Sequence, residues 1–263
     1  MYELRGRAVD QAGNEATTGR RVDGSPATLA LPLRFQSVLS GGIERTTTVP
    51  RVIRRRGKRR RVRRRQVRLV PTARVGYGRQ VRIAGRLANS DGQPIPNAQV
   101  FVLSRPPGGS DSLAGVVTTD PSGRYRYLAR ASHSRTIRFS YLGTSLVLPS
   151  SREANLVVPG SSTLRVNRRR ARNGGSVYFK GRVRSQPLPA TGKLIEMQAF
   201  FRGRWRTFST VRSDRQGRWR FRYRFGGTVG RVRYRFRAQL PAEGGYPFAT
   251  GRSRVVGVIV RGS

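Results

Sequence analysis

A ten-residue pattern occurs twice in the chain, at residues 78–87 and again at residues 174–183. Both copies read Gly-x-x-Val-x-(Ile/Phe)-x-Gly-Arg-(Leu/Val). Residues 120–127 are matched by residues 214–221, and Arg138-Phe139 is matched by Arg235-Phe236. Three landmarks in the same order, at nearly the same spacing, predict a tandem duplication of a unit of about 95 residues, which is the size of a small domain.

The apolar residues of both units alternate with polar residues over short runs. In residues 217–225 four aromatic residues alternate with four Arg, and residues 231–238 continue the same alternation. A period of two places successive side chains on opposite faces of a strand. Turn residues such as the Asp-Pro-Ser-Gly of residues 120–123 separate the runs, and no segment has a helical period. The pattern predicts many short strands in a sandwich or barrel.

Residues 85–100 contain Gly-Arg-Leu, then Asp-Gly-Gln-Pro and Ala-Gln-Val, and residues 118–125 read Thr-Thr-Asp-Pro-Ser-Gly-Arg-Tyr. This part of the chain, about residues 81–143, resembles the carboxypeptidase regulatory-like domains. The resemblance implies a transthyretin-like, Ig-related β-sandwich that decorates larger secreted or surface proteins without a catalytic role. The second unit lacks the Asp-Gly-x-Pro segment, so its assignment rests on the repeat. The whole arrangement resembles the tandem Ig-like modules of Gly/Arg-rich actinobacterial surface proteins.

The first residues resemble the end of a further domain. Ala8, Asp10, Ala12, Gly13 and Asn14 match the last hairpin of bacterial Ig-like domains. An edge hairpin without partners does not fold alone. We expect these residues to be the remnant of an upstream Ig-like domain of a longer protein.

These observations predict an all-β chain with two tandem Ig-like β-sandwich domains, preceded by a truncated β-hairpin remnant and a basic β-hairpin with its linker. We expect the remnant at residues 1–23 and the linker with the Arg-rich hairpin at residues 24–66. The first sandwich is expected at residues 67–160 and the second at residues 161–263.

The formal net charge of +42 is extreme, and only three of the 54 basic residues are Lys. A strongly basic chain attracts anionic polymers. The other explanation is a coding bias that supplies Arg wherever an exposed cation is tolerated. The densest run surrounds Gly57, which predicts a hairpin with its tip at residues 56–58. Its candidate polyanion-binding residues are Arg54, Arg55, Arg56, Lys58, Arg59, Arg60, Arg61, Arg63, Arg64 and Arg65.

The second unit carries two further rows of Arg on strands that we expect to pair with each other across Gly226-Gly227. The aromatic residues between them are expected to face the core, and the aromatics of this domain to point away from the Arg face. The secondary basic face predicted from these rows comprises Arg218, Arg220, Arg222, Arg224, Arg231, Arg233, Arg235 and Arg237.

The chain contains few residues of the types that carry out catalysis. The single His, His133, lies between two Ser in a predicted loop, there is no Cys, and the 12 acidic residues are scattered. A triad needs a carboxylate to orient the imidazole, and a glycosidase pair would have to come from distant residues such as Glu196 and Asp214. We expect no enzyme activity, no catalytic residue, no cofactor and no metal site. The apolar run at residues 255–260 is too short to cross a membrane.

The function predicted from the sequence is a non-catalytic spacer or adhesion segment of a larger exported or cell-surface protein. Its expected partners are upstream domains of the same protein and an anionic cell-wall polymer, and we expect a monomer. The alternative is electrostatic, sequence-nonspecific binding of nucleic acid or another polyanion through residues 54–65. The extracellular or surface location follows from the family resemblance.

Overall fold

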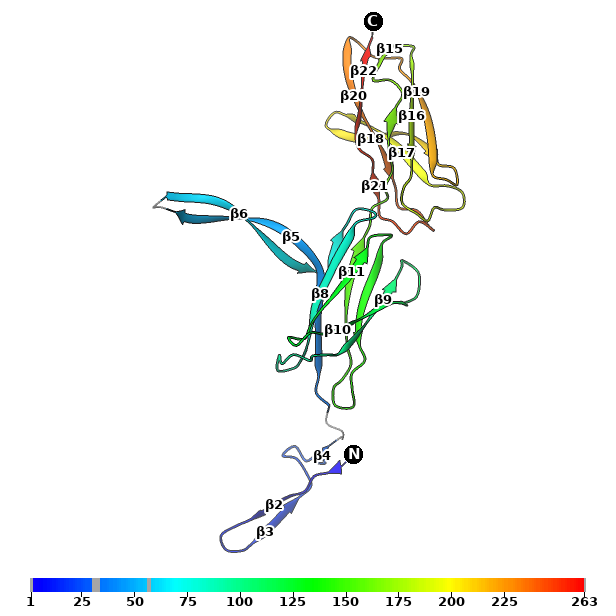
Figure 1. Ribbon diagram of the computed structural model, residues 1–263. Helices are drawn as coiled ribbons and strands as arrows, with labels where there is room; N and C mark the ends of the chain where they lie inside the picture. Colours follow the sequence, from blue (N-terminus) through cyan, green and yellow to red (C-terminus); the bar gives the residue numbers. More distant parts are fainter. Residues whose placement is uncertain (1, 30–33, 56–57, 263) are drawn as a thin grey trace.

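The computed structural model describes residues 2–29, 34–55 and 58–262. Within these ranges the chain contains strands and turns and no helix, as the period-two pattern predicts. Figure 1 shows the strands gathered into two sandwiches, with a small hairpin near the N-terminus and a long two-stranded arm. Among the described residues there is no helix long and apolar enough to span a membrane.

The first sandwich consists of two sheets packed face to face. One sheet has the order β10-β9-β12-β13-β7 and the other has the order β11-β8-β5-β6. Its strands are β5 (Ser37–Arg55), β6 (Lys58–Val70), β7 (Thr72–Arg74), β8 (Gln80–Asn89), β9 (Gln99–Arg105), β10 (Ser112–Thr118), β11 (Arg124–Arg130), β12 (Arg135–Tyr141) and β13 (Ser150–Val157). Inward residues such as Ile83, Val102, Phe139 and Leu156 are almost completely buried between the sheets.

The second sandwich repeats this construction with a three-stranded sheet, β14-β16-β19, and a larger sheet, β15-β22-β20-β17-β18, with β21 paired to β20. Its strands are β14 (Arg165–Val166), β15 (Arg170–Arg172), β16 (Ser176–Arg182), β17 (Leu194–Phe201), β18 (Arg204–Arg212), β19 (Arg218–Arg224), β20 (Arg231–Leu240), β21 (Gly251–Arg252) and β22 (Val256–Arg261). The two units are therefore Ig-like β-sandwiches in tandem.

The duplicated sequence landmarks occupy equivalent places in the two sandwiches. The first landmark forms β8 and β16, and the second forms β11 and β19. In each unit these two strands pair, with Tyr125 opposite Gly85 and Trp219 opposite Gly181. The repeat in the sequence is thus a repeat of one strand pair in the fold.

The segment expected as a linker contributes a strand to the first sandwich. Residues 37–43 of β5 pair with β8, and Leu39 and Ile43 are buried in the core. The linker expected at residues 24–66 is therefore wrong for residues 37–43. Leu39 and Ile43 are four residues apart, so both side chains point to the same face of the strand and are buried in the core. Beyond Ile43 the same strand leaves the sandwich, and its described residues pair only with β6.

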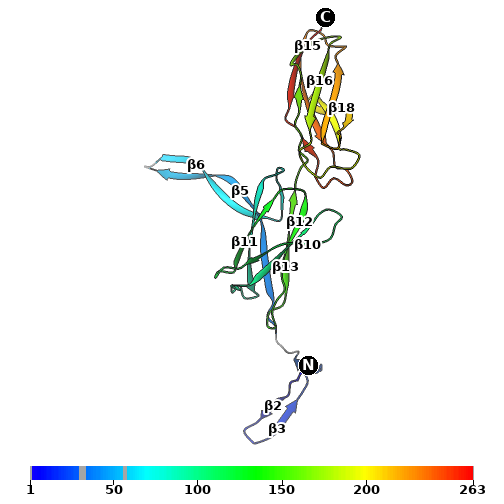
Figure 2. The same cartoon turned by 45° about the vertical axis from the view of Figure 1, so that its right-hand side comes forward.

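The departure of β5 from the sheet occurs at two glycines. A Cβ on Gly42 would lie 2.7 Å from the carbonyl oxygen of Val70, and a Cβ on Gly41 would lie 2.9 Å from that of Ala84. Only glycine allows this close crossing of backbones. Figures 1 and 2 show the arm formed by β5 and β6 leaving the sandwich in both views.

The N-terminal residues form small strand pairs. β1 (Tyr2–Glu3) pairs with β4 (Thr28–Leu29), and β2 (Gly6–Val9) pairs with β3 (Glu15–Thr18). Asp10 accepts backbone hydrogen bonds from Ala12 and Asn14 in the turn that the sequence predicted. All residues of β2 and β3 are exposed.

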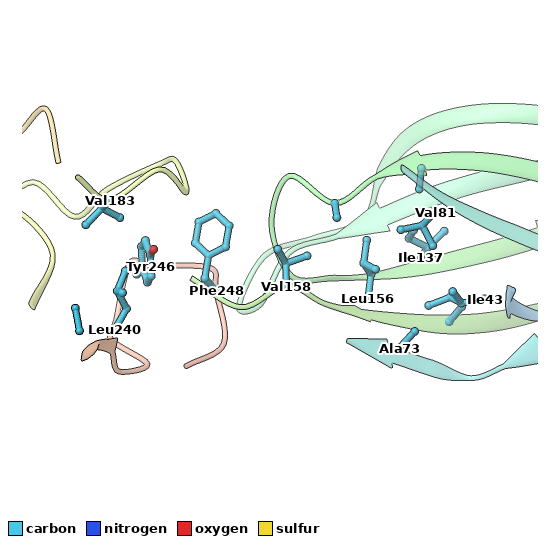
Figure 3. Close-up of a cluster of buried hydrophobic side chains, with 14 of the residues drawn as sticks. Ile43, Ala73, Val81, Ile137, Leu156, Val158, Val183, Leu240, Tyr246 and Phe248 are labelled. Carbon is cyan, nitrogen blue, oxygen red and sulfur yellow. The ribbon is translucent and has the colours of Figure 1, made fainter. Parts of the chain in front are cut away.

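The two sandwiches meet through a continuous set of buried apolar side chains. Figure 3 shows Phe248 between Tyr246 of the second sandwich and Val158 at the end of the first. The ring of Phe248 contacts the ring of Tyr77 edge-on, with centroids 5.8 Å apart, and lies 4.7 Å from the centroid of Tyr246. The core of each unit therefore continues into the junction.

Candidate functional site

The arm is an antiparallel ribbon in which each face is defined by the register. Arg54 lies opposite Arg59, Val52 opposite Arg61, and Pro50 opposite Arg63. These three pairs face one side of the ribbon, and the pairs between them face the other side. The pairs made by residues 54, 52, 50 and 48 of β5 share a face because side chains two residues apart on a strand point the same way. Five arginines lie on this face, and all five are exposed: Arg54, Arg59, Arg61, Arg63 and Arg65.

The remaining predicted arm residues lie elsewhere. Arg64 is exposed on the other face, opposite Val49. Arg55, Lys58 and Arg60 belong to the paired backbone of β5 and β6, and the positions of their side chains are not described. Arg56 and the predicted tip at Gly57 lie outside the described residues.

The charge on the arm is not neutralised by the arm itself. The only acidic residue in β5 or β6 is Glu44, at the base of the arm. No described Arg of the arm takes part in a side-chain ion pair. A ribbon of 13 residues extends about 40 Å at roughly 3.4 Å per residue, so the arm presents its cations well away from the sandwich.

The two Arg rows of the second sandwich do not form one face. The row on β19 lies in the three-stranded sheet, and the row on β20 lies in the larger sheet, so they cover opposite outer sides of the sandwich. The prediction that β19 and β20 pair with each other is wrong, because the Gly-rich residues 226–230 carry the chain from one sheet to the other. The prediction that the aromatic residues between these Arg face the core is confirmed, since Trp219, Phe225 and Phe236 are buried.

The larger sheet also carries aromatic residues on its outer face, contrary to the expectation that the aromatics of this domain point away from the Arg face. Phe200 and Trp205 lie opposite each other on β17 and β18, with ring centroids 5.4 Å apart. The guanidinium carbon of Arg235 lies 3.8 Å from the centroid of Phe200, and that of Arg237 lies 4.2 Å from the centroid of Trp205. Thus not all aromatics of this domain point away from the Arg face.

One feature of the sequence could have predicted that Phe200 faces outward, whereas nothing in the sequence alone indicates the position of Trp205. Residues 200 and 201 are both aromatic, so alternation along the strand places one of the two rings on the outer face. Trp205 faces outward because the ladder shifts register on β18, where Gln198 lies opposite Thr207 and Met197 lies opposite Ser209, so that Phe208 is an extra residue. Such bulges are set by pairing and are not visible in one strand alone.

A buried ion pair holds the loop around residue 243 against the second sandwich. Lys193 is completely buried, and its Nζ donates to Oε2 of Glu243 at 2.6 Å. Arg212 donates to the other oxygen of Glu243 at 2.9 Å. Burial alone would raise the pKa of Glu243, but hydrogen bonds from Lys193, Leu194 and Arg212 lower it to about 2. This pair is structural, because its polar groups satisfy one another.

His133 lies in a loop, as predicted, and is partly buried. Its Nδ1 is 3.1 Å from Oγ of Ser132, and both burial and the nearby Arg135 lower its pKa. No carboxylate of the described residues forms a hydrogen bond with it. Asp214 accepts backbone hydrogen bonds from Gln216 and Arg218 in its turn, whereas Glu196 accepts from Gln198, Thr207 and Gln239 on the outer face. Across the described residues, no group of three potential metal ligands is present.

Comparisons with known proteins give only distant likenesses. No protein-family model and no curated protein matches the chain. Among solved structures, the tetra-tandem repeat in the extending region of a large adhesion protein has 13% sequence identity and a TM-score of 0.33, and covers 96% of this chain. The adhesin InvE of Yersinia pseudotuberculosis has 14% identity, a TM-score of 0.31 and 72% coverage. The N-terminal four Ig domains of Dscam1 isoform 8.4 have 11% identity, a TM-score of 0.40 and 98% coverage.

This chain spans 65%, 56% and 54% of the lengths of those three chains. Likenesses at these identities and TM-scores do not indicate a function for this chain.

Proposed function

We propose that this chain is a non-catalytic structural segment of a larger exported or cell-surface protein, in which two β-sandwiches act as a stiff spacer. The observation that supports the proposal is the junction between the sandwiches. Each sandwich is already stiffened by its own sheet pairing, so the junction is the place where a spacer of two sandwiches would bend. The family resemblance of the first unit is consistent with this role.

The connection between the sandwiches is held by backbone and side-chain contacts. Residue 159 forms a parallel bridge with Ala249, and Gly160 N donates to Ala249 O at 2.8 Å while Ala249 N donates to Val158 O at 2.9 Å. Ser134 N of the first sandwich donates to Pro247 O of the second at 2.9 Å. With Phe248 packed against Tyr77, these contacts oppose independent motion of the two units.

Small-angle X-ray scattering tests the spacer. The intact chain is compared with the double variant Tyr77→Ser, Phe248→Ser, and circular dichroism checks that both sandwiches remain folded. We expect scattering from the intact chain to fit one elongated arrangement of the sandwiches, and the variant to show a broader distance distribution. Identical curves for the two proteins would contradict the proposal.

A second candidate function is electrostatic binding of nucleic acid or another polyanion by the arm. It is favoured by the five exposed arginines on one face of a ribbon whose described residues beyond Ile43 and Val70 pair only with each other. An isolated two-stranded ribbon is only marginally stable in water, and like charges along it repel. A polyanion would relieve this repulsion through counterion release.

The arm is tested by salt titration of binding to heparin and to random-sequence duplex DNA. In the arm variant, Arg54, Arg59, Arg61, Arg63 and Arg65 become Ser. The control removes four exposed arginines of the first sandwich and one of the N-terminal segment: Arg20, Arg82, Arg124, Arg126 and Arg130. Polyanion binding by the arm predicts a shallower salt slope in the arm variant alone. Equal losses in both variants would show that the charge is a diffuse surface property.

A further inference from the structure

A group of arginines lies at the end of the larger sheet of the second sandwich, apart from the arm. Arg172 on β15 lies opposite Arg261 on β22, which in turn lies opposite Arg231 on β20. Adjacent strands are about 4.8 Å apart, so three like charges sit side by side across three strands. With Arg168, Arg170 and Ile259 they line a cavity of about 520 Å³, which we call the arginine cavity.

The charge of the arginine cavity is not balanced by the protein. Only three acidic residues follow residue 160, and each has another role. Glu243 pairs with Lys193 and Arg212, Asp214 closes a turn, and Glu196 binds Gln198, Thr207 and Gln239. Like charges directly opposite each other destabilise a sheet, so a bound anion would remove a repulsion that the described residues leave in place.

A row of arginines leads away from the arginine cavity along β20, and two of them, Arg235 and Arg237, are stacked on aromatic rings. Nε of Arg233 lies close to Gly257, where a Cβ would be only 3.3 Å away. Arg235 lies on the ring of Phe200, and Arg237 lies on Trp205 and donates to Gln198 at 2.8 Å. Stacked guanidinium groups lose less side-chain freedom when they bind, because their plane is already fixed.

We propose that the arginine cavity and this row bind a linear anion made of phosphate groups repeated along a chain without nucleobases. The guanidinium fork matches the oxygens of a phosphate in a bidentate manner. Five cations around one cavity require several negative charges, which a chain of phosphates supplies and a lone carboxylate does not. The row at residues 233–237 continues the charge at intervals of about 6.8 Å, two residues along a strand.

The aromatic residues favour a chain without bases over a single-stranded nucleic acid. Proteins that bind single strands offer open aromatic faces to the bases. Here Arg235 covers a face of Phe200, and Arg237 covers a face of Trp205. These rings hold arginines in place and are poorly available for base stacking.

Calorimetric titration with inorganic tripolyphosphate at physiological salt tests the site. In the cavity variant, Arg170, Arg172, Arg231 and Arg261 become Gln. The matched control, with Arg82, Arg124, Arg126 and Arg130 changed to Gln, removes the same charge from exposed positions of the first sandwich whose side chains form no hydrogen bond or ion pair in the described structure. We expect one tripolyphosphate per chain, at least tenfold weaker binding in the cavity variant, and less than a twofold change in the control.

Longer polyphosphate distinguishes the row from the cavity. Chains of more than ten phosphates should bind more tightly than tripolyphosphate, and the variant Arg233→Gln, Arg235→Gln should lose this gain while its tripolyphosphate affinity stays unchanged. Absence of tripolyphosphate binding, or equal losses in the cavity variant and the control, would overturn the site. Cavity-dependent binding of a sulfated heparin oligosaccharide or of single-stranded DNA that is tighter than that of polyphosphate of equal charge would overturn the proposed ligand.

Discussion

The indole ring of Trp219 lies against the backbone of Gly181, so that a Cβ on this glycine would be 2.5 Å from the ring. Tyr125 covers Gly85 in the same way in the first sandwich. Each ring also donates a hydrogen bond to a neighbouring segment, Trp219 Nε1 to Ser162 Oγ at 3.0 Å and Tyr125 Oη to Ser40 O at 2.9 Å. The duplicated Gly of the sequence is thus the floor beneath a large aromatic side chain.

Substitution of this glycine should destabilise the second sandwich. We expect Gly181→Ala to lower the free energy of unfolding by about 1–3 kcal/mol, because the new methyl group collides with Trp219 and with the carbonyl oxygen of Thr163. Denaturation followed by tryptophan fluorescence reports on this unit, since both Trp residues lie in it. Gly226→Ala is the control, because no atom of the described residues lies within 4 Å of a Cβ there. Equal effects of the two substitutions would count against this packing.

The Lys193–Glu243 pair predicts a loss of stability in acid. Because the folded pKa of Glu243 is about 2, below its ordinary value of 4.5, its contribution is fully present above pH 4.5 and is lost as the pH falls from 4.5 towards 2. Glu243→Gln should destabilise the chain by about 3–5 kcal/mol at pH 7, because it leaves the buried Lys193 without its anion.

Unfolding measured from pH 7 to pH 3 checks this prediction. The Glu243→Gln variant should lose less stability over that range than the unmodified chain does. The double variant Lys193→Met, Glu243→Gln should recover part of the loss at pH 7. A pH profile that is the same with and without Glu243 would contradict the assignment.

Substitution by Asp should have little effect on stability at one residue of β19 and a large effect at the next residue. Arg220 is exposed and Phe221 packs inside against Phe179 and Phe208. Arg220→Asp should change the free energy of unfolding by less than about 0.5 kcal/mol, whereas Phe221→Asp should unfold the second sandwich because it buries a charge. Thermal unfolding of the two variants checks the assignment of the faces, and unfolding by Arg220→Asp would refute it.

The local pattern predicted what single strands do, and it could not predict which strands meet. Alternation in residues 218–225 correctly placed Trp219 inside and its Arg neighbours outside. The pairing partners of β19 and β20 depend on where the Gly-rich connection goes, and that is decided by the packing of the whole sandwich. The register shift that turns Trp205 outward is likewise a property of the pair β17–β18.

The arm is a mixed case. The Arg-rich run around Gly57 predicted a hairpin, and the structure has β5 and β6 paired from Ile43–Val70 to Arg55–Lys58. The sequence did not indicate that β5 begins inside the sandwich, because Leu39 and Ile43 are separated by Ser-Gly-Gly, which is typical of a loop. The arginine cavity was also missed, since its residues come from three strands that are far apart in the sequence.

The most direct measurement for the stiff spacer is a distance distribution between the two sandwiches by electron paramagnetic resonance of paired spin labels. The chain contains no Cys, so Arg126→Cys and Arg220→Cys give one label on an exposed position of each sandwich without interference. We predict a single narrow distance distribution, which broadens when Phe248 is changed to Ser. A broad distribution in the unmodified junction would contradict the spacer.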